Sequence, residues 1–240
     1  FDALRTDGCR HAITDAIEDE DLRRLGAACA DMALLTGGSG IAMGVPQNFR
    51  RAGLLAAGGN ADSLPAIRGA EVVLAGSCSA ATLAQIDVMA QTRPVLRLDP
   101  IRLAEGWDPA EAVAWASQHM SDGPVLVYAS ATPDEVAATQ QRLGRERAGS
   151  AVEAALAAVA LGVVQAGARR LVVAGGETSG AVVQALGVKG LAIGPMIDPG
   201  VPATVSIGRE PVLAMALKSG NFGGRDFLLR AFDAMPGANA

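Results

Sequence analysis

Strand patterns that end in glycine and restart as helical patterns recur along this chain. The clearest is LVVAGGETSGAVVQALG at 171–187, where a β-branched run stops at two glycines and an apolar helical pattern follows. Similar junctions lie at 71–91 (EVVLAGSCS, then AATLAQIDVMAQ) and at 32–54. Alternation of strands with helices favours a parallel or mixed sheet covered by helices. The pattern therefore predicts an α/β fold with a layered sheet flanked by helices.

The other segments extend this pattern. We expect further strands at 94–99, 124–130, 170–176, 191–195, 203–207 and 212–218, and helices at 12–31, 41–54, 108–120, 133–146, 150–168, 177–188 and 224–233. The last three strands follow one another without a helix between them, so we expect antiparallel pairing there. The helix at 150–168 is Ala-rich and contains Glu153 and Gln165, so we expect a buried helix rather than a membrane span.

Composition and charge exclude several classes of protein. Half of the 240 residues are hydrophobic but only 3% are aromatic, which suits an aliphatic α/β core better than an aromatic-rich β-sandwich. The net charge is -5 and no long basic run occurs, so nucleic acid is not an expected partner. The three cysteines, Cys9, Cys29 and Cys78, have no CxxC spacing. This usage is typical of a reduced, cytoplasmic protein.

The polar, turn-rich segment GGNADSLPAIRG at 58–69 is the best candidate for a linker. It separates residues 1–57 from residues 70–240. The first residues carry neither an initiator Met nor a signal-peptide pattern, so we expect the chain to begin inside a longer protein. Residues 1–57 would then expose an apolar face. This predicts pairing with another chain, for example a homodimer with exchanged elements.

Four Gly/Ser-rich turns are candidates for an anion site. TGGSG (36–40), AGSCS (75–79) and AGGETSG (174–180) each follow an apolar strand pattern, and KSGNFGG (218–224) follows the last strand. The carboxyl ends of parallel strands meet at one edge of a sheet, where ligands bind. Glycine lets backbone N–H groups approach a phosphate, and a helix N-terminus adds positive charge. The turns therefore predict a ligand that carries phosphate.

Better-known signatures are incomplete, which leaves alternatives open. Lys218-Ser219 lacks the glycine spacing of a Walker A loop. GSGIAMG at 38–44 is a loose dinucleotide fingerprint, but the expected acid after a second strand is missing, so an NAD-dependent oxidoreductase is only an alternative. A non-catalytic module that binds a phosphorylated metabolite is another. No GxSxG motif accompanies His11 and His119, so a hydrolase triad is not expected.

Three charged residues beside these turns have more than one interpretation. Lys218 is either a strand-end lysine in solvent or a cation beside a phosphate. Asp198, in MIDPGVP, is either a turn residue before proline, which we favour, or a carboxylate facing Mg²⁺. Glu177 would repel a phosphate unless it meets Mg²⁺, a ribose hydroxyl or a helix N-terminal amide.

Four segments together resemble the C-terminal nucleotide-binding domain of the four-carbon acid sugar kinases. They are GSCSAATLAQI (76–86), GGETSGAVVQALGV (175–188), IGPMIDPGVP (193–202) and ALKSGNFGGRDF (216–227). The likeness covers residues 70–235, and residues 1–57 with their TGGSG turn resemble the end of the family's substrate-binding domain. The resemblance implies an ATP-dependent kinase that phosphorylates erythronate, threonate or an oxo-tetronate.

The resemblance also implies which residues bind. The nucleotide site would comprise Ser77 or Ser79, then Gly176, Glu177, Thr178, Ser179 and Gly220, with ATP and Mg²⁺ as cofactors. Lys218 joins this set as the candidate cation beside the phosphates. Gly38, Ser39 and Gly40 would lie on the side of the sugar acid. The family's catalytic aspartate motif, DDFTGA-like, does not occur in this sequence, so neither a catalytic base nor a metal ligand is predicted. Phosphoryl transfer depends on positioning and charge neutralisation, which suits glycines, hydroxyls and one lysine.

Overall fold

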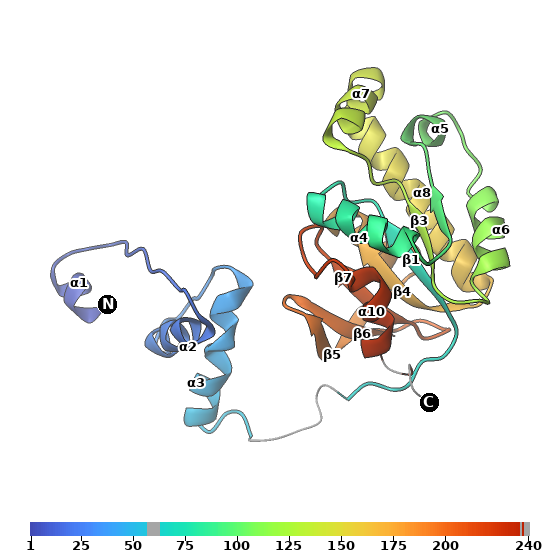
Figure 1. Cartoon of the computed structure of the whole chain (residues 1–240). Helices are drawn as coiled ribbons and strands as arrows, with labels where there is room; N and C mark the ends of the chain where they lie inside the picture. The colour runs from blue at the N-terminus through green and yellow to red at the C-terminus, as the bar shows by residue number, and fades with distance from the viewer. Residues whose placement is uncertain (57–62, 236, 238–240) are drawn as a thin grey trace. The chain divides into compact units, whose positions relative to one another are not determined.

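The computed structural model describes residues 1–56, 63–235 and 237. The chain divides into two compact units, residues 1–60 and residues 61–240 (Figure 1). The boundary falls within the segment predicted as a linker, and residues 57–62 of that segment lie outside the described residues.

The first unit is helical in its described residues. Its elements are α1 (Asp2–Thr6), α2 (Asp19–Ala28), the short 3₁₀ helix η1 (Ser39–Met43) and α3 (Val45–Arg51). The strand predicted at 32–40 is wrong, since residues 1–56 contain no strand. A strand satisfies its backbone groups only beside another strand, and the described part of this unit offers none. The helices predicted at 12–31 and 41–54 are shorter than expected.

The second unit is built on a seven-stranded mixed sheet. Its strands are β1 (Ala70–Ala75), β2 (Val95–Arg97), β3 (Val125–Tyr128), β4 (Ala168–Ala174), β5 (Gly190–Asp198), β6 (Val201–Ile207) and β7 (Ala214–Lys218). Their order across the sheet is β2-β3-β1-β4-β7-β6-β5. β1, β2, β3, β4 and β7 are mutually parallel, whereas β6 pairs antiparallel with both β5 and β7. The predicted α/β fold and its antiparallel last strands are confirmed.

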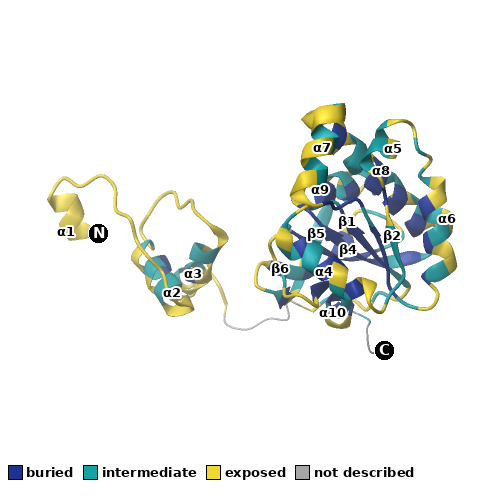
Figure 2. Cartoon of the chain, turned by 45° about the horizontal axis from the view of Figure 1, so that its top comes forward, coloured by how far each residue is buried: buried dark blue, intermediate teal, exposed yellow. Residues whose placement is uncertain are grey.

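Helices cover both faces of this sheet (Figure 2). They are α4 (Ala80–Ala90), α5 (Pro100–Ala104), α6 (Ala110–His119), α7 (Pro133–Leu143), α8 (Arg145–Gln165), α9 (Gly176–Ala185) and α10 (Phe227–Ala234). α4 and α10 pack on one face, and α6, α8 and α9 pack on the other. Alternate residues of β1 serve the two layers, because Val73 packs with α4 and α10 whereas Val72 packs with α6, α8 and α9. Burial on both faces explains the continuous apolar strand runs.

The long helix α8 is a core helix. By length and composition alone it could cross a membrane. Its residues Leu156, Val159 and Val163 are fully buried against the sheet, as expected for the segment predicted at 150–168. The helix starts earlier than predicted, because Gly144 ends α7 with a φ of 83° and α8 begins at the next residue. Glycine reaches this left-handed region without steric cost.

The carboxyl ends of four parallel strands are in register. Ala75 at the end of β1 pairs with Tyr128 of β3 and with Ala174 of β4, and Ala174 pairs with Lys218 of β7. The turns after these strands therefore start at one edge of the sheet. The helices that follow β1 and β4, α4 and α9, lie on opposite faces. Such a switch between neighbouring strands opens a crevice at the sheet edge.

Candidate functional site

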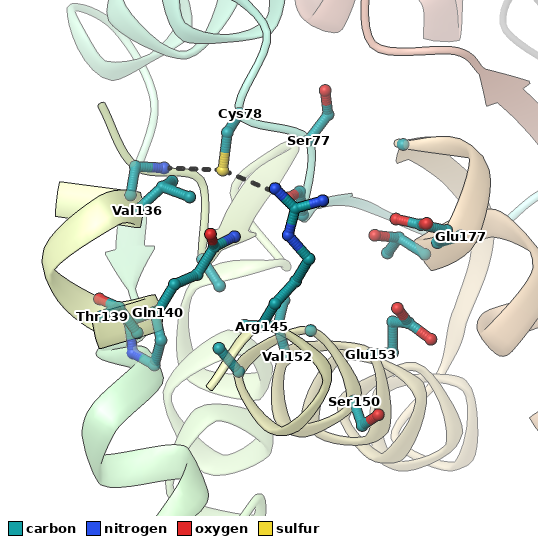
Figure 3. A pocket seen from close by; sticks show the side chains of 18 of the residues that line it. Ser77, Cys78, Val136, Thr139, Gln140, Arg145, Ser150, Val152, Glu153 and Glu177 are labelled. Atoms are coloured by element: carbon teal, nitrogen blue, oxygen red, sulfur yellow. Dashed lines mark hydrogen bonds between the residues drawn. The ribbon is translucent and has the colours of Figure 1, made fainter. Parts of the chain in front are cut away.

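A pocket of about 580 Å³ lies at this edge (Figure 3). Its wall comes from the turns after β1, β3 and β4, from Gly220 after β7, and from the facing sides of α7 and α8. The volume lies within the range of roughly 300–1,000 Å³ that is typical of small-molecule sites.

The N-terminus of α9 opens into the pocket. Gly175 precedes the helix with a φ of 127°, and no side chain in the described part of the chain caps its first turn. The backbone N–H groups of the first turn, at Gly176, Glu177 and Thr178, are therefore available to a ligand. They carry the positive end of the helix dipole, which favours an anion.

Three of the predicted turns meet here at van der Waals distance. A Cβ added to Gly76 would lie 2.3 Å from the Thr178 hydroxyl oxygen. A Cβ added to Gly220 would lie 2.1 Å from Ser77 Oγ and 2.9 Å from Ser79 Oγ. Glycine at both positions is what allows the turns after β1, β4 and β7 to approach so closely.

Not every predicted residue lines the pocket. Ser77, Gly176, Glu177, Thr178 and Gly220 do. The other three predicted residues, Ser79, Ser179 and Lys218, are not among the residues that line it. Ser79 caps α4 by accepting a hydrogen bond from the Thr82 backbone N–H at 3.2 Å. Ser179 is buried, and its hydroxyl has no hydrogen-bond partner within the described chain.

Lys218 is buried beside Gly220, which lines the pocket. Its side chain is 1% exposed and donates to Thr82 Oγ1 and to the Gly220 carbonyl, both at 3.0 Å. Burial lowers the pKa of Lys218 to about 8. No ion pair within the described ranges involves it. The interpretation as a strand-end lysine in solvent is wrong, because the last turn folds over this side chain.

Two polar residues of α4 hold the turn after β7. Thr82 Oγ1 donates to the Gly220 carbonyl at 2.9 Å. Gln85 Nε2 donates to three consecutive carbonyls, those of Phe222, Gly223 and Gly224, at 3.1, 2.9 and 3.0 Å. Sequence reasoning missed this role. The signal was present, since polar residues on the buried face of a helix need hydrogen-bond partners.

Asp198 holds the other end of the same turn. Its Oδ2 accepts a hydrogen bond from the Gly224 backbone N–H at 2.9 Å and pairs with Arg230 of α10. The Arg230 guanidinium is the main reason why the pKa of Asp198 lies below its ordinary value. The structure therefore places Asp198 in the anchoring of a turn, and it does not line the pocket.

Arg145, the first residue of α8, is a pocket residue that sequence reasoning missed. Its side chain points across the pocket toward Ser77 and Cys78 (Figure 3). In the part of the chain that the structure describes, no carboxylate forms an ion pair with it. A cation in the first turn of a helix opposes the helix dipole. Because Arg145 lowers the local stability of α8, its presence at this position suggests a role in binding an anion.

The remaining predicted turn, TGGSG, lies in the first unit. Gly38, Ser39 and Gly40 fall within residues 1–60, and the residues named above as lining the pocket fall within residues 61–240. The dinucleotide fingerprint at 38–44 also lacks its context, because no strand precedes it within residues 1–56.

Comparison with known proteins agrees with this geometry. Residues 72–228 match the model of a family described as a nucleotide-binding C-terminal domain. A 3-oxo-tetronate kinase of Burkholderia multivorans is 59% identical over 98% of this chain and 55% of its own length. The chain thus spans about half the length of the curated relatives it matches.

Solved structures also resemble the chain, among them the following two. One, from Salmonella typhimurium, is provisionally described as a tRNA synthase; it has a TM-score of 0.79 and 35% identity, and the match covers 96% of this chain and 54% of that one. The other, from Bordetella bronchiseptica, is a domain-swapped dimer with bound citrate. It has a TM-score of 0.52 and 22% identity, covering 90% of this chain and 51% of that one. At this identity it shows the fold alone.

Proposed function

The chain belongs to the nucleotide-binding C-terminal domain family of the four-carbon acid sugar kinases, and from this premise we propose that it forms the ATP-binding half of a kinase. The kinase would transfer the γ-phosphoryl group of ATP to a hydroxyl of erythronate, threonate or an oxo-tetronate. The observation that carries the proposal is the meeting of three glycine-containing turns at the open N-terminus of α9. A phosphate chain needs such a cluster of backbone donors.

The residues of this chain would act by binding and positioning. The first-turn N–H groups of α9 and the Ser77 hydroxyl would donate to phosphate oxygens, and Arg145 would add the pocket's free positive charge. The buried Lys218 and Thr82 would keep Gly220 in place, so that Ser77 stays directed at the ligand. Phosphoryl transfer asks mainly for such positioning and for charge neutralisation.

Magnesium fits this pocket. Mg²⁺ is usually held by one or two carboxylates together with the phosphates of its ligand. Glu177 and Glu153 both line the pocket, and the described residues contain no cluster of three or more His, Cys, Asp or Glu that would hold a metal by itself. These two carboxylates are the candidates to hold Mg²⁺, which would offset the charge of the phosphates.

Several wider properties belong to the same proposal. The sugar-acid substrate is supported by the curated 3-oxo-tetronate kinases that this chain resembles. A cytoplasmic location is supported by three cysteines without a disulfide.

Self-association is supported by apolar side chains of the first unit that are largely exposed, such as Ile13 and Leu34. Light scattering at several concentrations tests the last point, and a monomer throughout would remove it.

Two alanine substitutions of glycine test the nucleotide site. In Gly220→Ala the new Cβ collides with Ser77 Oγ, and we expect calorimetry to show ATP·Mg²⁺ affinity reduced at least about tenfold, a cost of about 1.4 kcal/mol. Gly180→Ala is the matched control, since nothing lies within 4 Å of its Cβ on α9. Equal affinity in both variants would contradict the site.

The rival functions give different results. A phosphometabolite-binding module would bind its ligand in the pocket, but the longer protein would release no ADP when given ATP and a sugar acid. An NAD-dependent oxidoreductase would bind NADH, which a fluorescence titration detects. For a kinase that contains this chain together with a sugar-acid-binding domain, we expect ADP release that depends on the sugar acid. We expect no saturable binding of NADH.

A further inference from the structure

A second pocket, of about 230 Å³, lies where β2 ends. It is enclosed by the end of β2, by α5 and by α6, and Figure 1 shows α5 and α6 on the same side of the second unit. Pro100 at the start of α5 lines the first pocket, whereas Asp99, Arg102 and Leu103 line the second. The two pockets therefore share α5 as a wall. The second is smaller than the roughly 300–1,000 Å³ of typical ligand sites, so it suits only a small molecule.

Both tryptophans of the chain line this second pocket. The sequence contains two, Trp107 and Trp115, and aromatic residues make up only 3% of the chain. Each indole packs against the core of the second unit and is only half-buried. Core packing explains the covered part of each ring. The uncovered part gives the pocket aromatic surface that a ligand can contact.

Four charged side chains at the rim of this pocket are exposed, namely Arg97, Asp99, Arg102 and Glu111. Their charges cancel. Arg102 faces Glu111 at 3.7 Å, and its guanidinium makes no hydrogen bond within the described residues. Arg97 donates through Nη2 to Glu135 at 2.7 Å, which leaves its other N–H groups free of protein acceptors in the described chain. The two guanidiniums therefore keep donors that a ligand can use.

This lining discriminates between classes of small molecule. A phosphate dianion would meet the Asp99 and Glu111 carboxylates, and a cation would meet the two guanidiniums. A small acid with one carboxylate and several hydroxyls suits every group. Its carboxylate accepts from guanidinium N–H groups, and its hydroxyls donate to Asp99 and Glu111. Its C–H groups pack on the indole faces, which carry the negative part of the ring quadrupole.

We propose that the second pocket binds a small polyhydroxylated monocarboxylic acid, and that Arg102 recognises the carboxylate of this ligand. Arg102 is suited to this role because a planar guanidinium matches a carboxylate with two parallel hydrogen bonds. The site lies outside the nucleotide pocket, so it does not depend on the proposed function. Its occupation does have a consequence for ATP.

Arg97 connects the second pocket to the first. Its bond to Glu135 joins β2 to the capping box of α7, and α7 lines the first pocket. An acid that draws Arg97 away from Glu135 loosens this end of α7 and so weakens ATP binding. Coupling between two sites is reciprocal, so ATP weakens the acid by the same factor. This regulatory effect, unlike the site, rests on the proposed function.

Tryptophan fluorescence of the 240-residue chain tests the site directly, because both tryptophans line the pocket. The probe is erythronate, which carries one carboxylate and several hydroxyls. We expect a saturable change in fluorescence. Erythritol lacks the carboxylate and acetate lacks the hydroxyls, so each should bind at least about tenfold more weakly. Absence of a saturable change with erythronate, or equal affinity for erythritol, would overturn the inference.

Arg102→Ala should weaken erythronate about five- to tenfold, since it removes a charge-assisted hydrogen bond. Arg102 is exposed, so the variant should fold. Arg142→Ala is the matched control. Arg142 lines neither pocket and also forms an exposed ion pair, with Glu105 at 2.9 Å. Its removal should leave erythronate affinity unchanged. Equal affinities in the two variants would place the ligand elsewhere.

Calorimetry with ATP·Mg²⁺ tests the coupling. Saturating erythronate should weaken ATP at least about threefold in the 240-residue chain. Glu135→Gln should abolish this difference, because Arg97 is then no longer held by a carboxylate. ATP affinity that erythronate does not change would overturn the coupling and leave the site standing. A chain that binds erythronate at this pocket but binds no ATP would contradict the proposed function and not the site.

Discussion

At the scale of single residues, Lys218 shows how burial changes a side chain's chemistry. Its ammonium is buried beside Gly220 with two hydrogen bonds and without an ion pair in the described chain. Desolvation disfavours the charged form and lowers the pKa to about 8 from the ordinary 10.5. As the pH rises, the folded state therefore releases this proton at a lower pH than the unfolded state does.

This pKa predicts a pH dependence of stability. Between about pH 8 and 10.5 the unfolded chain binds more protons at this position than the folded chain, so the free energy of unfolding should rise with pH. Below pH 8 both states are charged and this contribution is constant. Urea denaturation from pH 7 to 10.5 measures it, and Lys218→Met should remove the rise. An identical pH profile in the variant would contradict the assignment.

Arg145 leads to a second prediction at this scale. If its guanidinium binds phosphate oxygens, Arg145→Ala should weaken ATP about tenfold or more, because charge-assisted hydrogen bonds contribute about 1.5–3 kcal/mol. AMP should lose less affinity, since it carries one phosphate. Arg147→Ala is the matched control, because Arg147 lies on the same helix outside the pocket and donates to the Ala104 carbonyl. Calorimetry that shows equal losses of ATP and AMP would contradict this role.

At the scale of elements, α7 depends on its N-terminal capping box. Thr132 Oγ1 accepts from the Glu135 backbone N–H, and the Glu135 carboxylate accepts from the Thr132 backbone N–H. Glu135 also pairs with Arg97 of β2 at 2.7 Å. Because α7 supplies one wall of the pocket, these contacts connect the end of the helix to the geometry of the site.

The same contacts predict an acid-sensitive contribution to stability. Arg97, followed by Thr132, lowers the pKa of Glu135 from 4.5 to about 2. A lowered carboxyl pKa stabilises the fold above the unfolded value, so this contribution is complete above about pH 4.5 and is lost as pH falls toward 2. Glu135→Gln should therefore lose stability at pH 6 and show a shallower decline on acidification. Denaturation curves at several pH values measure both effects, and parallel declines would contradict the prediction.

Elements also show where sequence patterns succeed. The segment 171–187 predicted a strand, a turn and a helix, and the structure contains β4, Gly175 with a positive φ, and α9. The segment 32–40 has an equally apolar start, yet it forms no strand. The difference is not local. β4 is paired with β1 and β7, whereas nothing in residues 1–56 pairs with the other segment.

At the scale of the whole molecule, we expect nucleotide binding without phosphoryl transfer. The family resemblance assigns the acceptor-side aspartate to a DDFTGA-like motif, which this sequence lacks. The 240-residue chain should bind ATP·Mg²⁺ in calorimetry and show no ADP release above background when a four-carbon sugar acid is added. Sugar-acid-dependent ADP release by this chain alone would contradict the expectation that this chain binds ATP but needs the DDFTGA-like motif for phosphoryl transfer.

The sequence by itself determined the local backbone and the chemistry available along it. Apolar runs that end in glycine predicted the α/β fold, and they marked the turns at Ser77, Gly176 and Gly220, because glycines and helix starts are local signals. Only the tertiary structure decided which groups meet. Packing of α4 brings Thr82 to the Gly220 carbonyl, and the crossover from β3 to β4 places Arg145 opposite α9. These contacts join residues that are far apart in the chain. A local sequence pattern describes only neighbouring residues, so it cannot predict which distant residues meet.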